Sequence, residues 1–161
     1  MLDIFSLKVE EIASKIKDAQ LTSVEVCEKY IKKINKFEKD LKAWVYFDKK
    51  LLLEKAAEAD KYRQSGKPIG PLHGIPIAVK DIVGTVDMPT ECGTVIKKEK
   101  SFSQNAEIID LLLAAGAIVM GKTATAELAY LSPPKTTNPH DHSRTPGGSS
   151  SGSAAAVASF M

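Results

Sequence analysis

The chain has 161 residues, of which 43% are hydrophobic and 26% are charged, and its formal net charge is +2. This mixture is typical of a soluble globular domain, and the balance of charge excludes an extended nucleic-acid-binding surface. No apolar run reaches the roughly 18–20 residues of a membrane helix. Cys27 and Cys92 form no disulfide framework and the first residues form no signal peptide, so we expect a cytoplasmic protein without membrane contact.

Glycine and proline divide the chain into two parts. All ten glycines and all eight prolines lie at or after Gly66. This division predicts a helical region over residues 1–65 and a loop-rich region over 66–161, where sites are usually built. In the first region, the patterns predict a helix over Ser6–Ala19 with Ser6 as N-cap, a helix opened by the capping box Thr22–Glu25, a strand over 43–47 and a helix from Asp48 to about Gly66.

Helical and strand patterns alternate in the second region. This alternation favours an α/β layer with a largely buried sheet. The patterns predict a strand over Ile75–Val79 that ends at Lys80 and Asp81, an extended loop over 81–101, a helix over Ser103–Ala115, a strand over Ala117–Met120, a long loop over 131–149 and a helix over Ser150–Met161 that has not ended where the chain stops.

Residues Gly116–Thr123 match the phosphate-loop pattern G-x-x-x-x-G-K-[ST]. The four central residues are Ala, Ile, Val and Met, which are typical of a strand, whereas a phosphate loop needs a flexible backbone after a strand. The match therefore does not predict nucleotide binding.

Four residues could suggest a metal site. His140 and His142 are separated by one residue, and His73 and Cys92 lie elsewhere. Zinc sites usually show tighter spacing of several ligands, so we expect polar loop residues here and no metal site.

The segment Thr145–Val157 joins a flexible turn to an Ala-rich helix. Gly147 and Gly148 allow backbone conformations that other residues avoid. The serines that follow place hydroxyl groups at a helix N-terminus, where backbone amides can also bind anions. A serine-rich linker is the other interpretation, but the run leads directly into an apolar helix. This segment is therefore the strongest candidate site.

Lys80 ends an apolar strand, after Ile77, Ala78 and Val79. Partial burial of its ammonium group would favour the neutral amine, which can act as a general base. From spacing alone, a solvated lysine at the end of a strand is an equally good interpretation.

Together, Gly70–Asp81 and Pro146–Ser150 resemble the amidase signature family. The resemblance spans about residues 66–161 in a consistent order, and it includes Gly121–Thr123, Glu127 and Thr137–Pro139. It implies an α/β fold in which N-terminal helices, residues 1–65, precede the first part of an α/β/α core with a mixed central sheet, residues 66–161.

Members of that family hydrolyse or transfer amide groups with a Ser–cis-Ser–Lys triad. Carried over by position, Lys80 is the general base, and Ser149, after a cis Gly148–Ser149 bond, is the serine that passes the proton. The resemblance also implies supporting or substrate-binding roles for Ser150, Gly148 and Tyr130. It implies no metal ion and no cofactor, and a small-molecule amide as substrate.

The family places its nucleophilic serine in a Gly-Gly-Ser turn roughly two dozen residues after the bridging serine, beside oxyanion-stabilising amides. That position falls beyond Met161, so the resemblance implies the N-terminal part of an amidase, inactive alone. Ser151 and the short segment Leu128–Thr137 resemble general amidases more than the tRNA-dependent amidotransferase A subunit.

Two other functions are compatible with these residues. One is the A subunit of a glutamyl-tRNA(Gln) or aspartyl-tRNA(Asn) amidotransferase, which would release ammonia from glutamine for partner subunits. The other is a non-catalytic remnant of the fold that acts as an interaction protein. The macromolecular partners to consider are a second copy of the chain, as a homodimer, or the other amidotransferase subunits, and no direct contact with nucleic acid is expected.

Overall fold

The computed structural model describes residues 3–97 and 101–161. Within these ranges three strands form one sheet in the order β1–β3–β2. β1 (Trp44–Phe47) runs antiparallel to β3 (Ile118–Thr123), and β2 (Pro76–Lys80) runs parallel to β3, so the sheet is mixed. The helices are α1 (Val9–Lys17), α2 (Ser23–Leu41), α3 (Lys49–Gln64), α4 (Glu107–Ala114) and α5 (Ser151–Ala158), with short 3-10 helices η1 (Ile4–Ser6), η2 (Val95–Lys97) and η3 (Glu127–Ala129).

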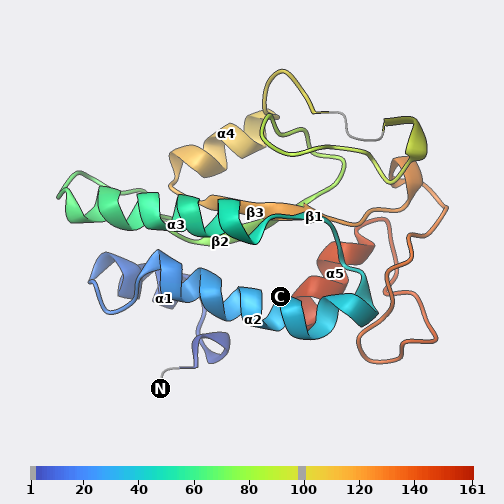
Figure 1. Ribbon diagram of the computed structural model, residues 1–161, viewed down its shortest axis with the longest axis horizontal. Coiled ribbons are helices and arrows are strands. Elements are labelled where there is room, and N and C mark those ends of the chain that lie inside the picture. Colours follow the sequence, from blue (N-terminus) through green and yellow to red (C-terminus); the bar gives the residue numbers. More distant parts are fainter. Residues whose placement is uncertain (1–2, 98–100) are drawn as a thin grey trace.

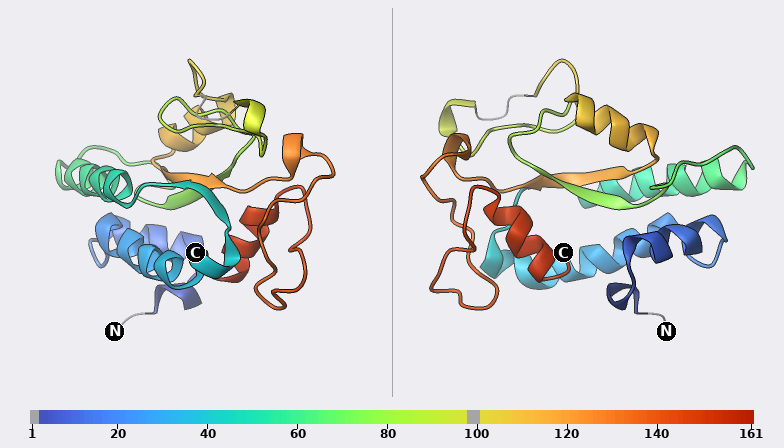
Figure 2. Two further views of the ribbon diagram at one scale, coloured as in Figure 1. Left: turned by 45° about the vertical axis from the view of Figure 1, so that its right-hand side comes forward. Right: turned by 180° about the vertical axis from the view of Figure 1, so that it is seen from behind.

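The sheet separates two groups of helices (Figure 1). α1, α2 and α5 lie on one side and α4 lies on the other, while α3 runs beside the sheet, and both views in Figure 2 keep this arrangement. The layers agree with the predicted α/β class. Of the loop predicted over 81–101, residues 98–100 lie outside the described residues. Among the described residues, no helix has the length and apolar character needed to cross a bilayer.

Two helices begin where the sequence predicts. In the capping box of α2, the Thr22 hydroxyl accepts a hydrogen bond from Glu25 N at 3.0 Å, and the Glu25 carboxylate accepts one from Thr22 N at 2.8 Å. At the start of α3, the Asp48 carboxylate accepts hydrogen bonds from Lys50 N at 2.8 Å and Leu51 N at 3.0 Å. These side chains satisfy amides that the first helical turn leaves without a backbone partner.

The predicted N-cap at Ser6 is wrong. Ser6 ends the short helix η1, in which the Asp3 carboxylate accepts a hydrogen bond from Phe5 N at 3.1 Å. α1 begins after Lys8, whose extended backbone separates the two helices. It ends before Ala19, whose φ of 57° lies in the left-handed region. Asp3 caps the separate short helix η1, and the chain is extended at Leu7 and Lys8 before α1 begins.

Two helices in the second region are shorter than predicted. α4 begins after Ala106 rather than at Ser103, because Ala106 N donates a hydrogen bond to Gly84 O at 3.0 Å and the chain is extended there. The prediction that α5 reaches Met161 is also wrong. Phe160 adopts a φ of 55°, in the left-handed region, and the helix ends before it.

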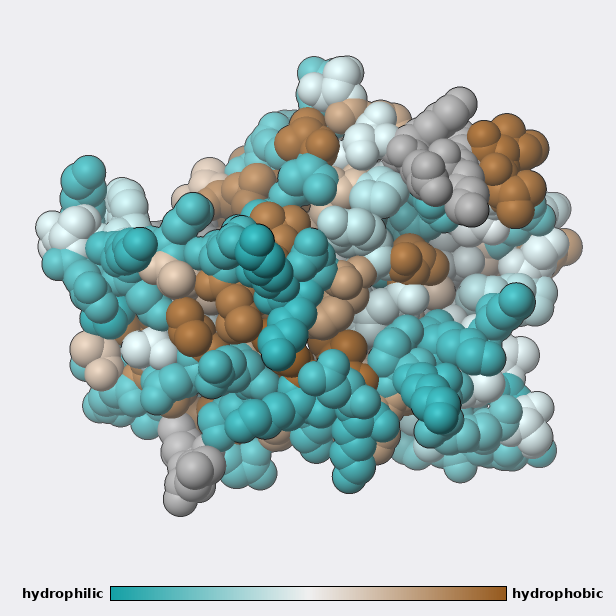
Figure 3. Space-filling view, viewed as in Figure 1, coloured by the Kyte–Doolittle hydropathy of each residue, from teal (hydrophilic) through white to brown (hydrophobic). Residues whose placement is uncertain are grey.

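The main core lies between the sheet and the helices α2, α3 and α5. Its buried members include Ile31, Ile34, Leu52, Ile118 and Ala155. On the face seen in Figure 3, hydrophilic side chains cover α1 and α2, and apolar atoms are visible between these helices and α3. Burial of this cluster holds α5 beneath the sheet, and α5 directly follows the serine-rich turn.

The predicted boundary between residues 65 and 66 falls in the turn after α3. β1 comes from the first part and pairs with β3 from the second, with Trp44 opposite Thr123. The first part therefore contributes a strand to the shared sheet, and the division into two regions stays a prediction.

Asp60 fastens α3 to the start of α2. Its buried carboxylate accepts hydrogen bonds from Ser23 N at 2.8 Å and Val24 N at 3.1 Å. We expect Asp60→Ala to lower the free energy of unfolding by about 2–3 kcal/mol, because two amides at the start of α2 lose their acceptor. Glu58→Ala, at an exposed position of the same helix, should change it by less than about 0.5 kcal/mol. Urea unfolding measures both, and equal losses would contradict the role given to Asp60.

Candidate active site

Lys80 lies at the carboxyl end of β2. It stands opposite Thr123 of β3, and its neighbour Val79 is buried in the core. The Lys80 carbonyl accepts hydrogen bonds from Ile82 N at 2.8 Å and Val83 N at 3.0 Å, so the chain turns directly after the strand. The strand pairing and this turn fix the backbone of Lys80, whose side chain is half-buried.

The Lys80 amine contacts the Ser149 hydroxyl. Nζ lies 2.6 Å from Oγ, within hydrogen-bond distance. The protonated amine donates in this contact, and the neutral amine would accept the serine proton across the same distance. Among the described residues, 3–97 and 101–161, no carboxylate forms an ion pair with Lys80. The arrangement therefore joins one potential base to one hydroxyl group.

The backbone of Ser149 is hydrogen-bonded to the residues that follow β3. The Gly148–Ser149 peptide bond is cis, as the resemblance implies. The Ser149 carbonyl oxygen accepts hydrogen bonds from Ala126 N at 2.9 Å and from Thr125 Oγ1 at 3.1 Å. Both donors lie just beyond the carboxyl end of β3, so the strand that pairs with Lys80 also fixes its hydroxyl partner.

The first turn of α5 is docked onto the same strand end. Gly152 N donates a hydrogen bond to Ala124 O at 2.8 Å, and the hydroxyls of Thr123 and Ser153 lie 2.7 Å apart. None of Thr123, Thr125 and Ser153 was predicted to support the site. The signal that could have found the threonines is their alternate spacing directly after an apolar strand, which places them on one face.

The other predicted site residues differ in their surroundings. Gly148 and Ser150 flank Ser149, but Ser150 is exposed and makes no capping hydrogen bond to α5. The Tyr130 side chain is 78% exposed and makes no hydrogen bond or ring contact within the described part of the chain. The structure thus brings Lys80 and Ser149 together, while the roles of Gly148, Ser150 and Tyr130 stay predictions.

The phosphate-loop match lies inside the sheet. β3 is longer than the predicted strand Ala117–Met120, because pairing with both neighbouring strands continues to Thr123. All of Gly121–Thr123 is buried in extended backbone. Such a backbone has no loop of free amides that could surround a phosphate group.

The residues considered for a metal site lie in different surroundings. His73 is buried, with Nε2 2.9 Å from Ala59 O, whereas His140 and His142 are exposed on the loop before Ser149. Cys92 is buried. Over the ranges that the structure describes, no three His, Cys, Asp or Glu side chains gather in a way that could hold a metal ion.

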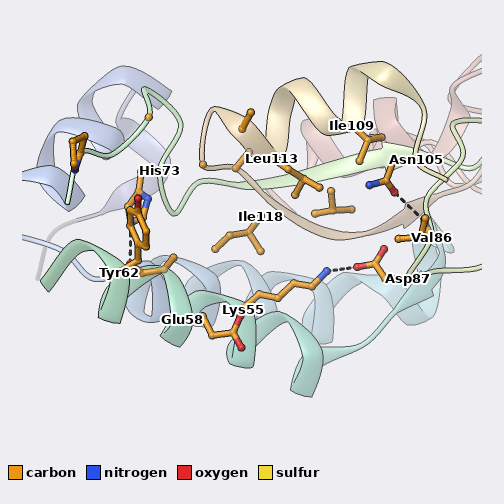
Figure 4. Close-up of a pocket in the computed structure, with 17 residues that line it drawn as sticks. Lys55, Glu58, Tyr62, His73, Val86, Asp87, Asn105, Ile109, Leu113 and Ile118 are labelled. Carbon is orange, nitrogen blue, oxygen red and sulfur yellow. Dashed lines mark hydrogen bonds and ion pairs between the residues drawn. The ribbon is translucent and has the colours of Figure 1, made fainter. Parts of the chain in front are cut away.

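A cavity of about 620 Å³ lies between α3, α4 and β3 (Figure 4). An ion pair between Lys55 and Asp87 crosses one end, and the rings of Tyr62 and His73 lie at the other with centroids 5.9 Å apart. Ile118, at the amino end of β3, lines the space between them. The contact between Lys80 and Ser149 lies at the carboxyl end of that strand, so the cavity is separate from the candidate site.

Comparisons with known proteins show what the chain is similar to. A family model described as Amidase matches residues 25–161. The chain is 39% identical over 164 residues to the A subunit of a glutamyl-tRNA(Gln) amidotransferase from Chloroflexus aurantiacus, covering 98% of the chain and 34% of that relative. The fold is similar to a peptide amidase from Stenotrophomonas maltophilia, with a TM-score of 0.88, 31% identity, and 96% and 34% of the two chains covered. It is also similar to a fatty acid amide hydrolase, with a TM-score of 0.89, 29% identity, and 97% and 29% covered. The chain spans about a third of the length of the curated relatives it matches.

Proposed function

The chain belongs to the amidase family, and on this premise we propose that it supplies the general base and the bridging serine of an amide hydrolase with a Ser–cis-Ser–Lys mechanism. The observation that carries the proposal is the 2.6 Å contact between Lys80 Nζ and Ser149 Oγ. The substrate is a carboxylic amide, and the products are a carboxylic acid and an amine or ammonia.

In the proposed reaction, neutral Lys80 accepts the hydroxyl proton of Ser149 while Ser149 Oγ takes the proton of a nucleophilic serine. The oxygen of that serine forms a bond to the amide carbonyl carbon. The C–N bond then breaks as the same relay, run in reverse, returns the proton to the departing nitrogen. Water activated through the relay hydrolyses the acyl-serine and releases the acid.

The nucleophile is expected roughly two dozen residues after Ser149, as the family resemblance implies. Two nearby serines are already engaged in packing. Ser151 is buried and its hydroxyl donates a hydrogen bond to Gly147 O at 2.6 Å, while the Ser153 hydroxyl lies against Thr123. We therefore propose that residues 1–161 hold the relay without the attacking hydroxyl group and are inactive alone.

The second candidate function is the A subunit of a tRNA-dependent amidotransferase. Its support is the 39% identity to a relative whose name gives it as that subunit of a glutamyl-tRNA(Gln) amidotransferase. The same lysine–serine relay would then release ammonia from glutamine, and the partners would be the other subunits. In favour of a general amidase, Ser151 and the short segment Leu128–Thr137 resemble general amidases more than the amidotransferase A subunit.

The product of the complete gene tests the proposal. We expect it to hydrolyse simple primary amides, and we expect a serine-directed fluorophosphonate to stop turnover by labelling one serine beyond Met161. The 161-residue chain should neither hydrolyse amides nor take up label. Turnover by the 161-residue chain would refute its inactivity, and a complete product that is neither active nor labelled would refute the amidase function.

Glutamine separates the two candidate functions. A general amidase hydrolyses simple amides without any partner. An amidotransferase A subunit is expected to release ammonia from glutamine only when its partner subunits are added. Ammonia release from glutamine that depends on added partners, without turnover of simple amides, would favour the second function.

A further inference from the structure

Lys122 is a second lysine of the sheet, on the face opposite to the candidate site. Successive residues of a strand point to opposite faces. Thr123 meets Ser153 of α5 on one face, so its neighbour Lys122 points to the other, toward the loop that follows β2. The Lys122 side chain is fully buried, although lysine is rarely buried unless it is paired.

The Lys122 amine holds the loop formed by residues 81–93. It donates hydrogen bonds to Val83 O at 2.8 Å, to Thr85 Oγ1 at 3.4 Å and to Thr90 Oγ1. A buried acceptor that loses its donor costs stability, so these three contacts fix the loop as well as the lysine.

Asp81 draws the far end of the 81–93 loop back to the end of β2. Its carboxylate is 1% exposed and accepts hydrogen bonds from Glu91 N at 3.1 Å and Gly93 N at 3.3 Å. Burial raises the pKa of Asp81 and lowers the pKa of Lys122, and the charge of each opposes this effect on the other. Two buried groups of opposite charge thus hold the loop.

The far end of the 81–93 loop supports the residues that hold Ser149. Leu128 N donates a hydrogen bond to Cys92 O at 2.8 Å. Gly93 packs closely against Thr125, because a Cβ at Gly93 would lie 2.8 Å from Thr125 O. Thr125 is one of the two donors to the Ser149 carbonyl. A continuous series of contacts therefore connects Lys122, through the 81–93 loop and Thr125, to Ser149.

On the basis of the proposed function, we propose that Lys122 is a positioning residue of the Lys80–Ser149 relay. It acts through the 81–93 loop and residues 125–128 on the backbone of Ser149. The same loop begins at the turn that fixes Lys80, so one buried amine supports both members of the relay. Energetic coupling between two residues can pass through contiguous packed and hydrogen-bonded groups such as these. The effect of a Lys122 substitution on the residues around Ser149 measures it.

Lys122→Met keeps an unbranched side chain and leaves three acceptors without their donor. In the 161-residue chain, we expect the amides of Gly93, Ala126 and Leu128 to exchange with deuterium at least about tenfold faster than in the wild type, while α2 and α3 keep their exchange rates. Lys55→Met is the matched control, because Lys55 of α3 also forms an ion pair with the 81–93 loop, at Asp87, but is not buried beneath that loop. It should leave those three amides unchanged.

In the product of the complete gene, Lys122→Met should lower kcat at least about tenfold, and by a larger factor than it changes KM, since the contacts from Lys122 lead to the backbone that holds the relay serine. A wild type without amide hydrolysis would refute the proposed function, and the exchange pattern would still decide the coupling. Equal acceleration throughout α2 and α3, or unchanged exchange at Ala126 and Leu128, would overturn the role of Lys122. If Lys122→Met does not fold, Thr90→Val removes a single acceptor and should give the same pattern more weakly.

Discussion

Lys80→Met, in the product of the complete gene, is expected to lower kcat for amide hydrolysis by about 10³-fold. Methionine has an unbranched stem of similar length but carries no group that accepts a proton. Ser149 Oγ then has no base at 2.6 Å, so the proton of the nucleophile has no path away from the reacting oxygen. Initial rates at saturating amide measure the loss.

The matched control is Lys50→Met, because the Lys50 side chain is 86% exposed and forms an ion pair with Glu54 on the surface of α3. We expect its kcat to stay within about twofold of the wild type. Thermal unfolding followed by circular dichroism should give both variants melting temperatures close to that of the wild type. A folded Lys80→Met variant that keeps a tenth of the wild-type kcat would show that another group is the base.

Gly152→Ala is expected to lower the free energy of unfolding by at least about 3 kcal/mol. A Cβ at this position would lie 2.2 Å from Ala43 O and 2.3 Å from Ala124 N. Both are backbone atoms of the sheet end, so no side-chain rotation relieves the overlap. α5 would have to move away from β3, breaking the Gly152 N to Ala124 O hydrogen bond and displacing Ser149.

Gly66→Ala is the control for that substitution. Among the described residues, nothing lies within 4 Å of a Cβ at Gly66, so the strain there comes from its φ of +72°. That strain costs about 1 kcal/mol. Urea unfolding of the 161-residue chain compares the two variants. If Gly152→Ala were no less stable than Gly66→Ala, the docking of α5 onto β3 would not be as described.

The sequence predicts those features that depend on residues close together in the chain. The Thr22–Glu25 capping box and the Asp48 cap were predicted correctly, because each joins residues at most three positions apart. The same holds for the presence of the apolar strands, although not for the end of β3, and for the rejection of Gly116–Thr123 as a phosphate loop. Ser6 was misassigned because the nearby Asp3 caps a short helix of its own. The sequence pattern does not show which of the two residues acts as the N-cap.

The support of the candidate site depends instead on pairings between distant residues. The pairing of Lys80 with Ser149, which are 2.6 Å apart, was implied by the family resemblance and not by the spacing of the residues. The placement of β3 between β1 and β2 decides that Thr125 meets the Ser149 carbonyl and that Lys122 meets the 81–93 loop. Strand order and register are set by the packing of the whole sheet, so a single sequence does not reveal these contacts.

The most direct test of the relay is a double-mutant cycle of Lys80→Met and Ser149→Ala, measured as kcat/KM for an amide in the product of the complete gene. Two groups that pass one proton act as a unit, so we predict that each single variant and the double variant lose about the same factor, about 10³-fold. Losses that multiply to about 10⁶-fold in the double variant would mean independent roles and would contradict the relay.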